Sequence, residues 1–139
     1  MKLYFAGPLF TTPERDWNAA VAAGLRTAGH DVFLPQEKEP GMDPAGIFAM
    51  DVAGIDAADA VVAVVDGPDV DSGTAWEIGY AHGTRKPLLL LRTDIRDGDG
   101  TLGAVNSMLA ESATIGLDLP GASTDAVIDA LIEALRTID

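Results

Sequence analysis

The chain has 139 residues, enough for one domain with a single buried core, and 47% of them are hydrophobic. Its net charge is −13, and aspartates outnumber glutamates by 16 to 6. Such a surface repels the phosphate backbone of nucleic acids and the headgroups of anionic membranes, so we expect neither a nucleic-acid polymer nor a membrane as partner.

The absence of cysteine excludes disulfides and thiolate catalysis. The apolar start of the chain is too short for a signal peptide or a membrane span, and no later apolar run reaches about 18 residues. We therefore expect a soluble, cytoplasmic protein. The acidic surface is typical of adaptation to high salt but also of an ordinary acidic mesophilic protein. A melting temperature that does not rise between low and molar KCl would exclude the first interpretation.

Strand-like and helix-like patterns alternate along the chain, with Gly7-Pro8 as a turn, Pro13 at a helix start and Gly29 at a helix end. In chain order the patterns predict strand Lys2–Ala6, helix Thr12–Ala28, strand Asp31–Leu34, loop Gln36–Gly41, helix Asp43–Ala57, strand Ala60–Val65, loop Asp66–Asp71, helix Ser72–Gly83, strand Pro87–Leu91, loop Asp94–Gly100, helix Leu102–Leu109, strand Thr114–Leu117 and helix Ser123–Ile138.

This alternation predicts a single domain over residues 1–139, an α/β three-layer sandwich with a mostly parallel sheet, because parallel strands need crossover helices. Right-handed crossovers make the sheet doubly wound, and five strands favour the order 2-1-3-4-5. Ligands bind outside the carboxyl ends of the strands where the order reverses, here between the first and third strands. The loops Ala6–Pro8 and Asp66–Ser72 should therefore bound the site.

The segment Asp71–Ala81 (DSGTAWEIGYA) begins a predicted helix beside this site and carries the carboxylates of Asp71 and Glu77. Two interpretations of Glu77 are open. In one, Thr74 and Glu77 form a capping box, and the carboxylate only satisfies a backbone N–H at the helix start. In the other, the helix at the switch point presents Glu77 to a ligand.

Asp51 lies at the margin of the apolar face of its helix. That face carries Ile47, Met50, Gly54, Ile55 and Ala58. Asp51 follows Ile47 by four residues, about 40° away on the helical wheel, whereas Asp56 should point to solvent. A carboxyl group beside an apolar face has a raised pKa and suits a proton donor. The alternative is an aspartate that reaches water from the helix margin.

Tyr4 lies near the end of the first strand, where its hydroxyl could approach the same crevice, although a strand tyrosine can also be a core residue. The phosphate-binding motifs GxGxxG and GxxxxGK[ST] are absent. The two histidines have no partner at metal-ligand spacing, and the aspartate-rich loops lack a complete calcium-binding loop. We expect neither a metal nor a cofactor.

Taken together, these residues resemble the nucleoside 2-deoxyribosyltransferase family. The resemblance spans about residues 3–110, and its most specific element is the Asp-Ser-Gly-Thr-Ala-aromatic-Glu stretch. The matching segments, in order, are Tyr4–Pro8 (YFAGP), Asp51–Ile55 (DVAGI), Ala58–Val62 (ADAVV) and Asp71–Ala81. The fold that the resemblance implies is flavodoxin-like, which agrees with the topology expected from the alternating elements.

The resemblance implies that Glu77 is the nucleophile at the anomeric carbon, that Tyr4 positions it, and that Asp51 contacts the base and helps to protonate it. Asp71 would hold sugar hydroxyls, and Asn106 would complete the site of a neighbouring subunit, so that a homo-oligomer is expected. The further substrate-binding positions are Gly7, Ser72, Gly73, Met108 and Gln36.

The implied reaction is deoxyribosyl transfer between nucleobases, with small-molecule nucleosides and nucleobases as partners. An N-glycosidic bond of a 2′-deoxynucleoside breaks through an oxocarbenium-like state, which a carboxylate can stabilise and then trap as a covalent sugar ester. An acid on the other side assists the poor leaving group. Transfer rather than hydrolysis requires a site that excludes water.

Two other functions are consistent with the pattern. One is an N-glycosidase acting on 2′-deoxynucleoside 5′-monophosphates, although Asp71 and a loop after the first strand without Arg or Lys disfavour a phosphate. Ser72 and Ser107 could still bind one. The other is a non-enzymatic receiver-like signalling module with Asp66 as phosphoacceptor. Such a module needs a lysine after its fifth strand, and no lysine follows Lys86 in this chain.

Overall fold

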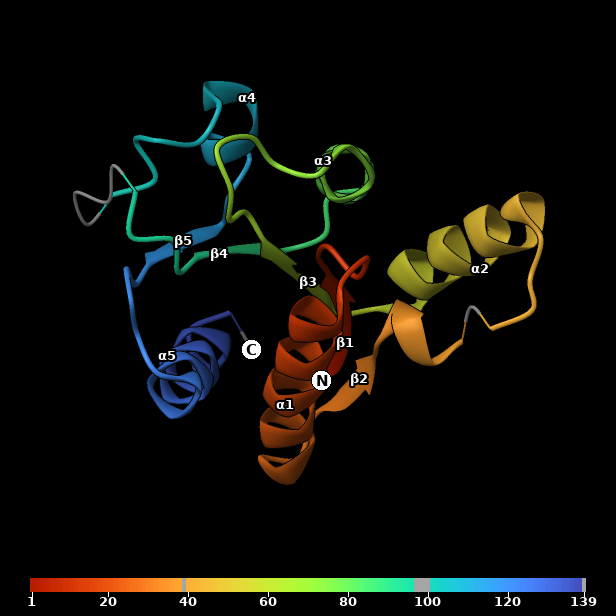
Figure 1. Cartoon of the computed structure of the whole chain (residues 1–139), viewed down its shortest axis with the longest axis horizontal. Helices are drawn as coiled ribbons and strands as arrows, with labels where there is room; N and C mark the ends of the chain where they lie inside the picture. The colour runs from red at the N-terminus through yellow and green to blue at the C-terminus, as the bar shows by residue number, and fades with distance from the viewer. Residues whose placement is uncertain (39, 97–100, 139) are drawn as a thin grey trace.

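A computed structural model describes residues 1–38, 40–96 and 101–138 of the chain, and helices and strands alternate along it (Figure 1). In chain order the elements are β1 (Lys2–Ala6), α1 (Thr12–Thr27), β2 (Asp31–Phe33), the 3-10 helix η1 (Pro35–Glu37), α2 (Pro44–Ala57), β3 (Ala60–Val64), α3 (Ser72–Gly83), β4 (Leu88–Arg92), α4 (Ser107–Ala110), β5 (Ile115–Asp118) and α5 (Thr124–Arg136).

The five strands form one sheet in the order β2-β1-β3-β4-β5, and all four neighbouring pairs are parallel. The predicted doubly wound α/β topology is therefore confirmed. From β1 the chain adds β2 at one side of the sheet, and β3, β4 and β5 then follow on the other side of β1. The strand order therefore switches between β1 and β3, which are neighbours with Tyr4 opposite Val61. The carboxyl ends of these two strands meet at one edge of the sheet, where a ligand site is expected.

Two hydrophobic layers hold the helices against the sheet. On one face, α1 and α5 cover the side chains of Leu3, Phe5 and Val62, and on the other α2 and α3 cover Tyr4 and Val61. Strands β3 and β4 are buried along their whole length, because helices pack on both of their faces.

The predicted and observed boundaries agree to within one or two residues except in two segments. The segment predicted as a helix over Leu102–Leu109 is helical only at Ser107–Ala110, where Asn106 caps the helix by accepting a hydrogen bond from the Met108 N–H. The predicted loop Gln36–Gly41 begins inside η1, and its residue 39 lies outside the described residues. Residues 97–100 of the predicted loop Asp94–Gly100 also lie outside them.

Helix α2 is the least embedded helix of the α2–α3 layer. Only Gly54 and Ile55, near its end, are buried, and its first half extends away from the sheet (Figure 1). Apolar side chains nevertheless lie on most sides of this helix, including Phe48, which is 58% exposed. A helix that is apolar on most sides is usually covered, so α2 offers unburied apolar surface. Within the described residues, no helix is long and apolar enough to cross a membrane.

Candidate active site

Tyr4 connects the sheet to the candidate site. The residue is fully buried in β1, its ring stacks on Phe33 at 5.5 Å between centroids, and its hydroxyl donates a 2.5 Å hydrogen bond to Oε1 of Glu77. Burial, followed by the charge of Glu77, its hydrogen bond and the nearby Asp51, raises the pKa of Tyr4 far above its usual range. Tyr4 is therefore protonated at neutral pH and donates its hydroxyl proton to Glu77.

The start of α3 excludes the capping interpretation of Glu77. Asp71, not Thr74, is the N-cap residue, and its carboxylate accepts hydrogen bonds from the backbone N–H and the hydroxyl of Thr74. Thr74 lies inside the helix, 1% exposed, so the predicted capping box is absent. Glu77 lies more than one turn into α3, where its carboxylate faces Tyr4 across 73 residues of sequence.

Asp51 reaches the same point from α2. It is half-buried, and its charge adds to burial and to the charge of Glu77 in raising the pKa of Tyr4. Asp56 is exposed, as predicted from the helical wheel, and accepts a hydrogen bond from the hydroxyl of Tyr80. The side chains of Tyr4, Asp51 and Glu77, which come from three separate elements, thus converge.

A cleft of about 530 Å³ lies between α2 and α3 with Asp51 and Glu77 in its wall. Its volume falls in the range of small-molecule sites, and its surface is mostly apolar. The remaining lining residues are Pro44, Ile47, Phe48, Gly73 and Trp76. Among the described residues that line the cleft, none is a lysine or an arginine, and the charged side chains are those of Asp51 and Glu77.

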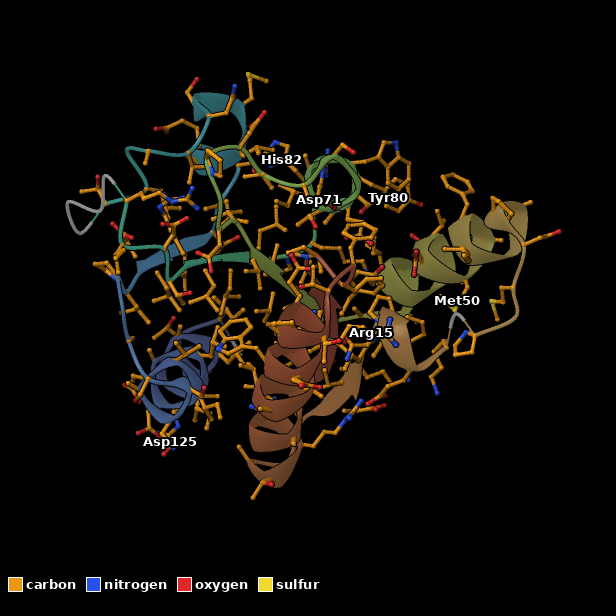
Figure 2. The ribbon with its side chains drawn as sticks, in the orientation of Figure 1. Arg15, Met50, Asp71, Tyr80, His82 and Asp125 are labelled. Atoms are coloured by element: carbon orange, nitrogen blue, oxygen red, sulfur yellow. The ribbon has the colours of Figure 1, made fainter. Side chains whose placement is uncertain are left out.

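Sequence reasoning missed the aromatic wall of the cleft. Trp76 packs edge-on against Phe48, at 5.3 Å between ring centroids, and stacks on Tyr80 at the same separation. Figure 2 shows Tyr80 on the side of α3 that faces α2. The aromatic residue immediately before Glu77 was a usable signal, because two residues at neighbouring positions of a helix can line the same groove. Phe48 gave no such signal, because an apolar residue in a helix is expected in the core.

Other predicted binding positions surround the start of α3. Gly73 lines the cleft, and Ser72 beside it is exposed. Asp71 is half-buried next to the helix (Figure 2), with its oxygen Oδ2 engaged by Thr74. Gly7 follows β1, and a side chain there would lie 3.3 Å from Val64, so the turn after β1 packs closely on β3.

Of the predicted substrate-binding residues only Gly73 lines the cleft of this chain, and three of the others lie well away from it. Gln36 is buried, and its amide donates to the carbonyl of Arg15 and accepts from Asn18. Asn106 and Met108 lie at α4, on the side of α3 away from α2, and Met108 is 81% exposed (Figure 1). A single chain therefore does not bring Asn106 into the cleft of Asp51 and Glu77.

Further carboxylates lie outside the cleft, in the part of the chain that the structure describes. Among the described residues, no group of three or more His, Asp or Glu side chains could hold a metal ion. Asp66, at the end of β3, accepts hydrogen bonds from the backbone N–H groups of Thr93 and Asp94 and from the Thr93 hydroxyl. Both of its oxygens are thus engaged in joining two loops.

The fold and this site define a class: a flavodoxin-like α/β protein with two carboxyl groups and a tyrosine at a cleft beside the topological switch point. The sequence model of the family described as nucleoside 2-deoxyribosyltransferase matches residues 3–120. The chain belongs to this family. The match includes β5, beyond the stretch that the motifs alone indicated.

Solved structures support the same assignment. The 2-deoxyribosyltransferase of Bacillus psychrosaccharolyticus is 25% identical with a TM-score of 0.73, over 95% of this chain and 96% of that one. The 2-desoxiribosyltransferase of Leishmania mexicana is 26% identical with a TM-score of 0.71, over 95% and 97%. The CMP N-glycosidase of Clostridium botulinum shares the fold at 18% identity, with a TM-score of 0.68 over 96% and 99%. No curated protein has a matching sequence.

Proposed function

We propose that this protein transfers 2-deoxyribosyl groups between nucleobases, with Glu77 as the nucleophile. The observation that carries the proposal is the hydrogen bond of 2.5 Å from the Tyr4 hydroxyl to Glu77, in the wall of a cleft that also holds Asp51. A carboxylate that only capped a helix would not need a buried phenol to orient it. Membership of the nucleoside 2-deoxyribosyltransferase family supports the same reaction.

In the first step, a Glu77 oxygen attacks C1′ of the deoxynucleoside while the bond from C1′ to the base nitrogen breaks. The electron pair of that bond goes to the base, and protonated Asp51 donates its proton to it. The product is a deoxyribosyl ester of Glu77, a free base and ionised Asp51. The negative charge of Glu77 stabilises the oxocarbenium-like transition state, as in retaining glycosidases.

In the second step, a nitrogen of an acceptor base attacks C1′ from the side that the first base left. The ester bond to Glu77 breaks, and the proton of the acceptor goes to Asp51, which restores both carboxyl groups. Two inversions at C1′ give net retention. If water enters instead, the same step releases free deoxyribose, so transfer depends on how well the apolar walls of Ile47, Phe48 and Trp76 exclude water.

The charges around the cleft favour free nucleosides over 5′-monophosphates. A phosphate binds best where arginine, lysine or several N–H donors face it. The lining of the cleft contains two carboxyl groups and no basic side chain, and Asp71 adds a third carboxylate at the start of α3. Activity on dCMP or dGMP that exceeds activity on deoxynucleosides would reverse this preference.

We further propose that the working unit is a homo-oligomer in which Asn106 and Met108 of one chain complete the cleft of another. Both residues lie beyond α3 from the cleft of their own chain, and Met108 is 81% exposed. The exposed apolar surface of α2 gives a second chain a place to pack, because two copies with a charge of −13 each can associate only where carboxylates are sparse.

The test is incubation with deoxyinosine in the presence and absence of free adenine. Formation of deoxyadenosine shows transfer, hypoxanthine alone shows hydrolysis, and the absence of both products contradicts the proposal. Glu77→Ala should abolish either reaction, and quenched wild-type enzyme should carry a deoxyribosyl adduct on Glu77. Glu133→Gln changes an exposed glutamate of α5, outside the cleft and away from α4, and is the matched control. A Glu77→Ala variant with wild-type turnover would reject the nucleophile.

A further inference from the structure

The ring of Tyr4 packs against Gly54, a residue of α2 that has no side chain. Gly54 is buried, and a Cβ atom built on it would lie 3.0 Å from Cδ2 and Cε2 of Tyr4 and 3.0 Å from Cε1 of Phe33. Carbon atoms in favourable contact are about 3.5–4.0 Å apart. The backbone of α2 therefore lies so close to the Tyr4 ring that only glycine, which has no Cβ atom, fits at this position without a shift.

The ring has little freedom to accommodate a side chain at this position. Tyr4 is 0% exposed, and its ring stacks on Phe33, which itself meets the same Cβ position. The strand that carries Tyr4 is hydrogen-bonded on both sides, to β2 and to β3. A push of a few tenths of an ångström on one edge of the ring therefore moves the hydroxyl at its tip or moves α2 outward.

Both movements affect the reacting groups. The Tyr4 hydroxyl donates to Glu77 at 2.5 Å, so a shifted ring lengthens this bond or turns the carboxylate. Asp51 precedes Gly54 by three residues on the same helix, so an outward shift of α2 moves Asp51 away from Glu77. Catalytic geometry is sensitive to such displacements, because about 1 Å of misplacement can cost about 10²-fold in rate.

We propose that Gly54 is a positioning residue for the Tyr4–Glu77 pair, an inference that rests on the proposed function of Glu77. Gly54 acts by the absence of a Cβ atom rather than by backbone freedom. It lies within α2 and is not among the glycines with positive φ, so alanine is compatible with its backbone and favoured by helix propensity. The close contact with two rings is thus the only observed obstacle to alanine.

The test is a cycle of variants in the base-exchange reaction. Gly54→Ala should lower kcat about tenfold or more with little change in KM, because the groups that act in the transition state are displaced. In a Tyr4→Phe background no hydroxyl remains to be misplaced, so Gly54→Ala should lower kcat by a clearly smaller factor than it does in the wild type. Gly79→Ala makes the same substitution in α3 with no atom within 4 Å of the new Cβ, and it should leave kcat unchanged.

Phe33→Leu combined with Gly54→Ala keeps the test decisive if Gly54→Ala alone folds poorly. The smaller side chain frees space beside the new methyl group, so the pair should fold and regain activity relative to Gly54→Ala. Wild-type kcat for Gly54→Ala, or an equal loss in both Tyr4 backgrounds, would overturn the inference. A crystal structure of Gly54→Ala distinguishes failure of this inference from failure of the proposed function. If the Tyr4 hydroxyl still donates its hydrogen bond to Glu77 in that structure, the positioning role is rejected, whatever the substrate of the protein is.

Discussion

Because the phenol of Tyr4 is buried, the free energy of unfolding should depend on pH in the alkaline range. The pKa of Tyr4 is raised above its ordinary value of 10.0, first by burial and then by the charge of Glu77. Above about pH 10 the unfolded chain releases this proton while the folded chain retains it, so the folded state binds more protons. The free energy of unfolding therefore falls as pH rises, by up to about 1.4 kcal/mol per pH unit for this group.

Tyr4→Phe should remove this contribution to the pH dependence. We expect urea-unfolding curves of the wild type to lose more stability between pH 9 and 11, roughly the range around the ordinary tyrosine pKa, than those of Tyr4→Phe. Tyr80→Phe changes the other tyrosine of the chain, whose hydrogen bond to Asp56 lies at the surface, and it should keep most of the wild-type slope. Equal slopes for the wild type and Tyr4→Phe would contradict the burial argument.

The proposed role of Asp51 as a proton donor can be tested with nucleosides that differ in how easily the base leaves. Asp51→Asn keeps the shape of the side chain but removes the proton that we propose assists the departing base, so cleavage of ordinary deoxynucleosides should slow by about 10²–10⁴-fold. Nucleosides whose bases leave easily without a proton should react at nearly the wild-type rate. We expect single-turnover rates to separate the two substrate classes, and equal losses for both would show that Asp51 has another role.

The chemistry-bearing residues were predictable to different degrees. The helical wheel placed Asp51 beside an apolar face and Asp56 in solvent, and both positions agree with the structure. The contact between Tyr4 and Glu77 joins residues 73 positions apart, and no spacing rule gives such a pair. Only the resemblance connected them. The wall residue Phe48 was missed because its exposure depends on how far α2 stands from the sheet.

Two helices end in the same motif with different residues. At the end of α1, Gly29 has a φ of 95° and its N–H donates to the carbonyl of Arg26. At the end of α3, Arg85 has a φ of 61° and its N–H donates to the carbonyl of His82. This left-handed conformation favours glycine, so Arg85 carries a strain that Gly29 does not.

Arg85→Gly should therefore raise the free energy of unfolding by about 1 kcal/mol, since the left-handed conformation costs about 1–2 kcal/mol with a Cβ atom and the greater chain entropy of unfolded glycine offsets part of this gain. Gly29→Ala makes the opposite change in the same motif and should lower stability by a similar amount. Chemical denaturation of both variants measures the effect. A less stable Arg85→Gly variant would mean that the arginine side chain contributes more than its backbone conformation costs.

The elements themselves were largely predictable, and the exceptions have local causes. Strand β1 and helix α3 have the predicted boundaries, because turn residues and caps surround clear apolar patterns. The helix predicted to start at Leu102 begins only at Ser107, since Asn106 supplies the cap that fixes its start. The sheet order followed from the alternation of elements, because parallel strands and right-handed crossovers leave few topologies.

At the scale of the whole molecule, the distribution of charge bears on assembly. The chain carries 22 acidic residues, yet α2 contributes only Asp51 and Asp56, and its other side chains are apolar. Repulsion between two such chains is long-ranged and weakens with salt, whereas apolar contacts between them do not. An oligomer built through this region should therefore be stabilised by salt.

The shared site can be tested by mixing two inactive variants. Glu77→Ala lacks the proposed nucleophile but supplies Asn106, and Asn106→Ala lacks the amide but supplies Glu77. If Asn106 completes the cleft of a neighbouring chain, a mixed oligomer contains a wild-type site, and activity should rise well above the sum of the separate variants. A mixture of Glu77→Ala and Asp51→Asn is the matched control, because both residues line the same cleft of one chain, so no intact site can form. The rise should be larger in molar KCl, where association is stronger. Activity that stays at the sum, although chromatography shows mixed oligomers, would mean that Asn106 serves only as the cap of α4.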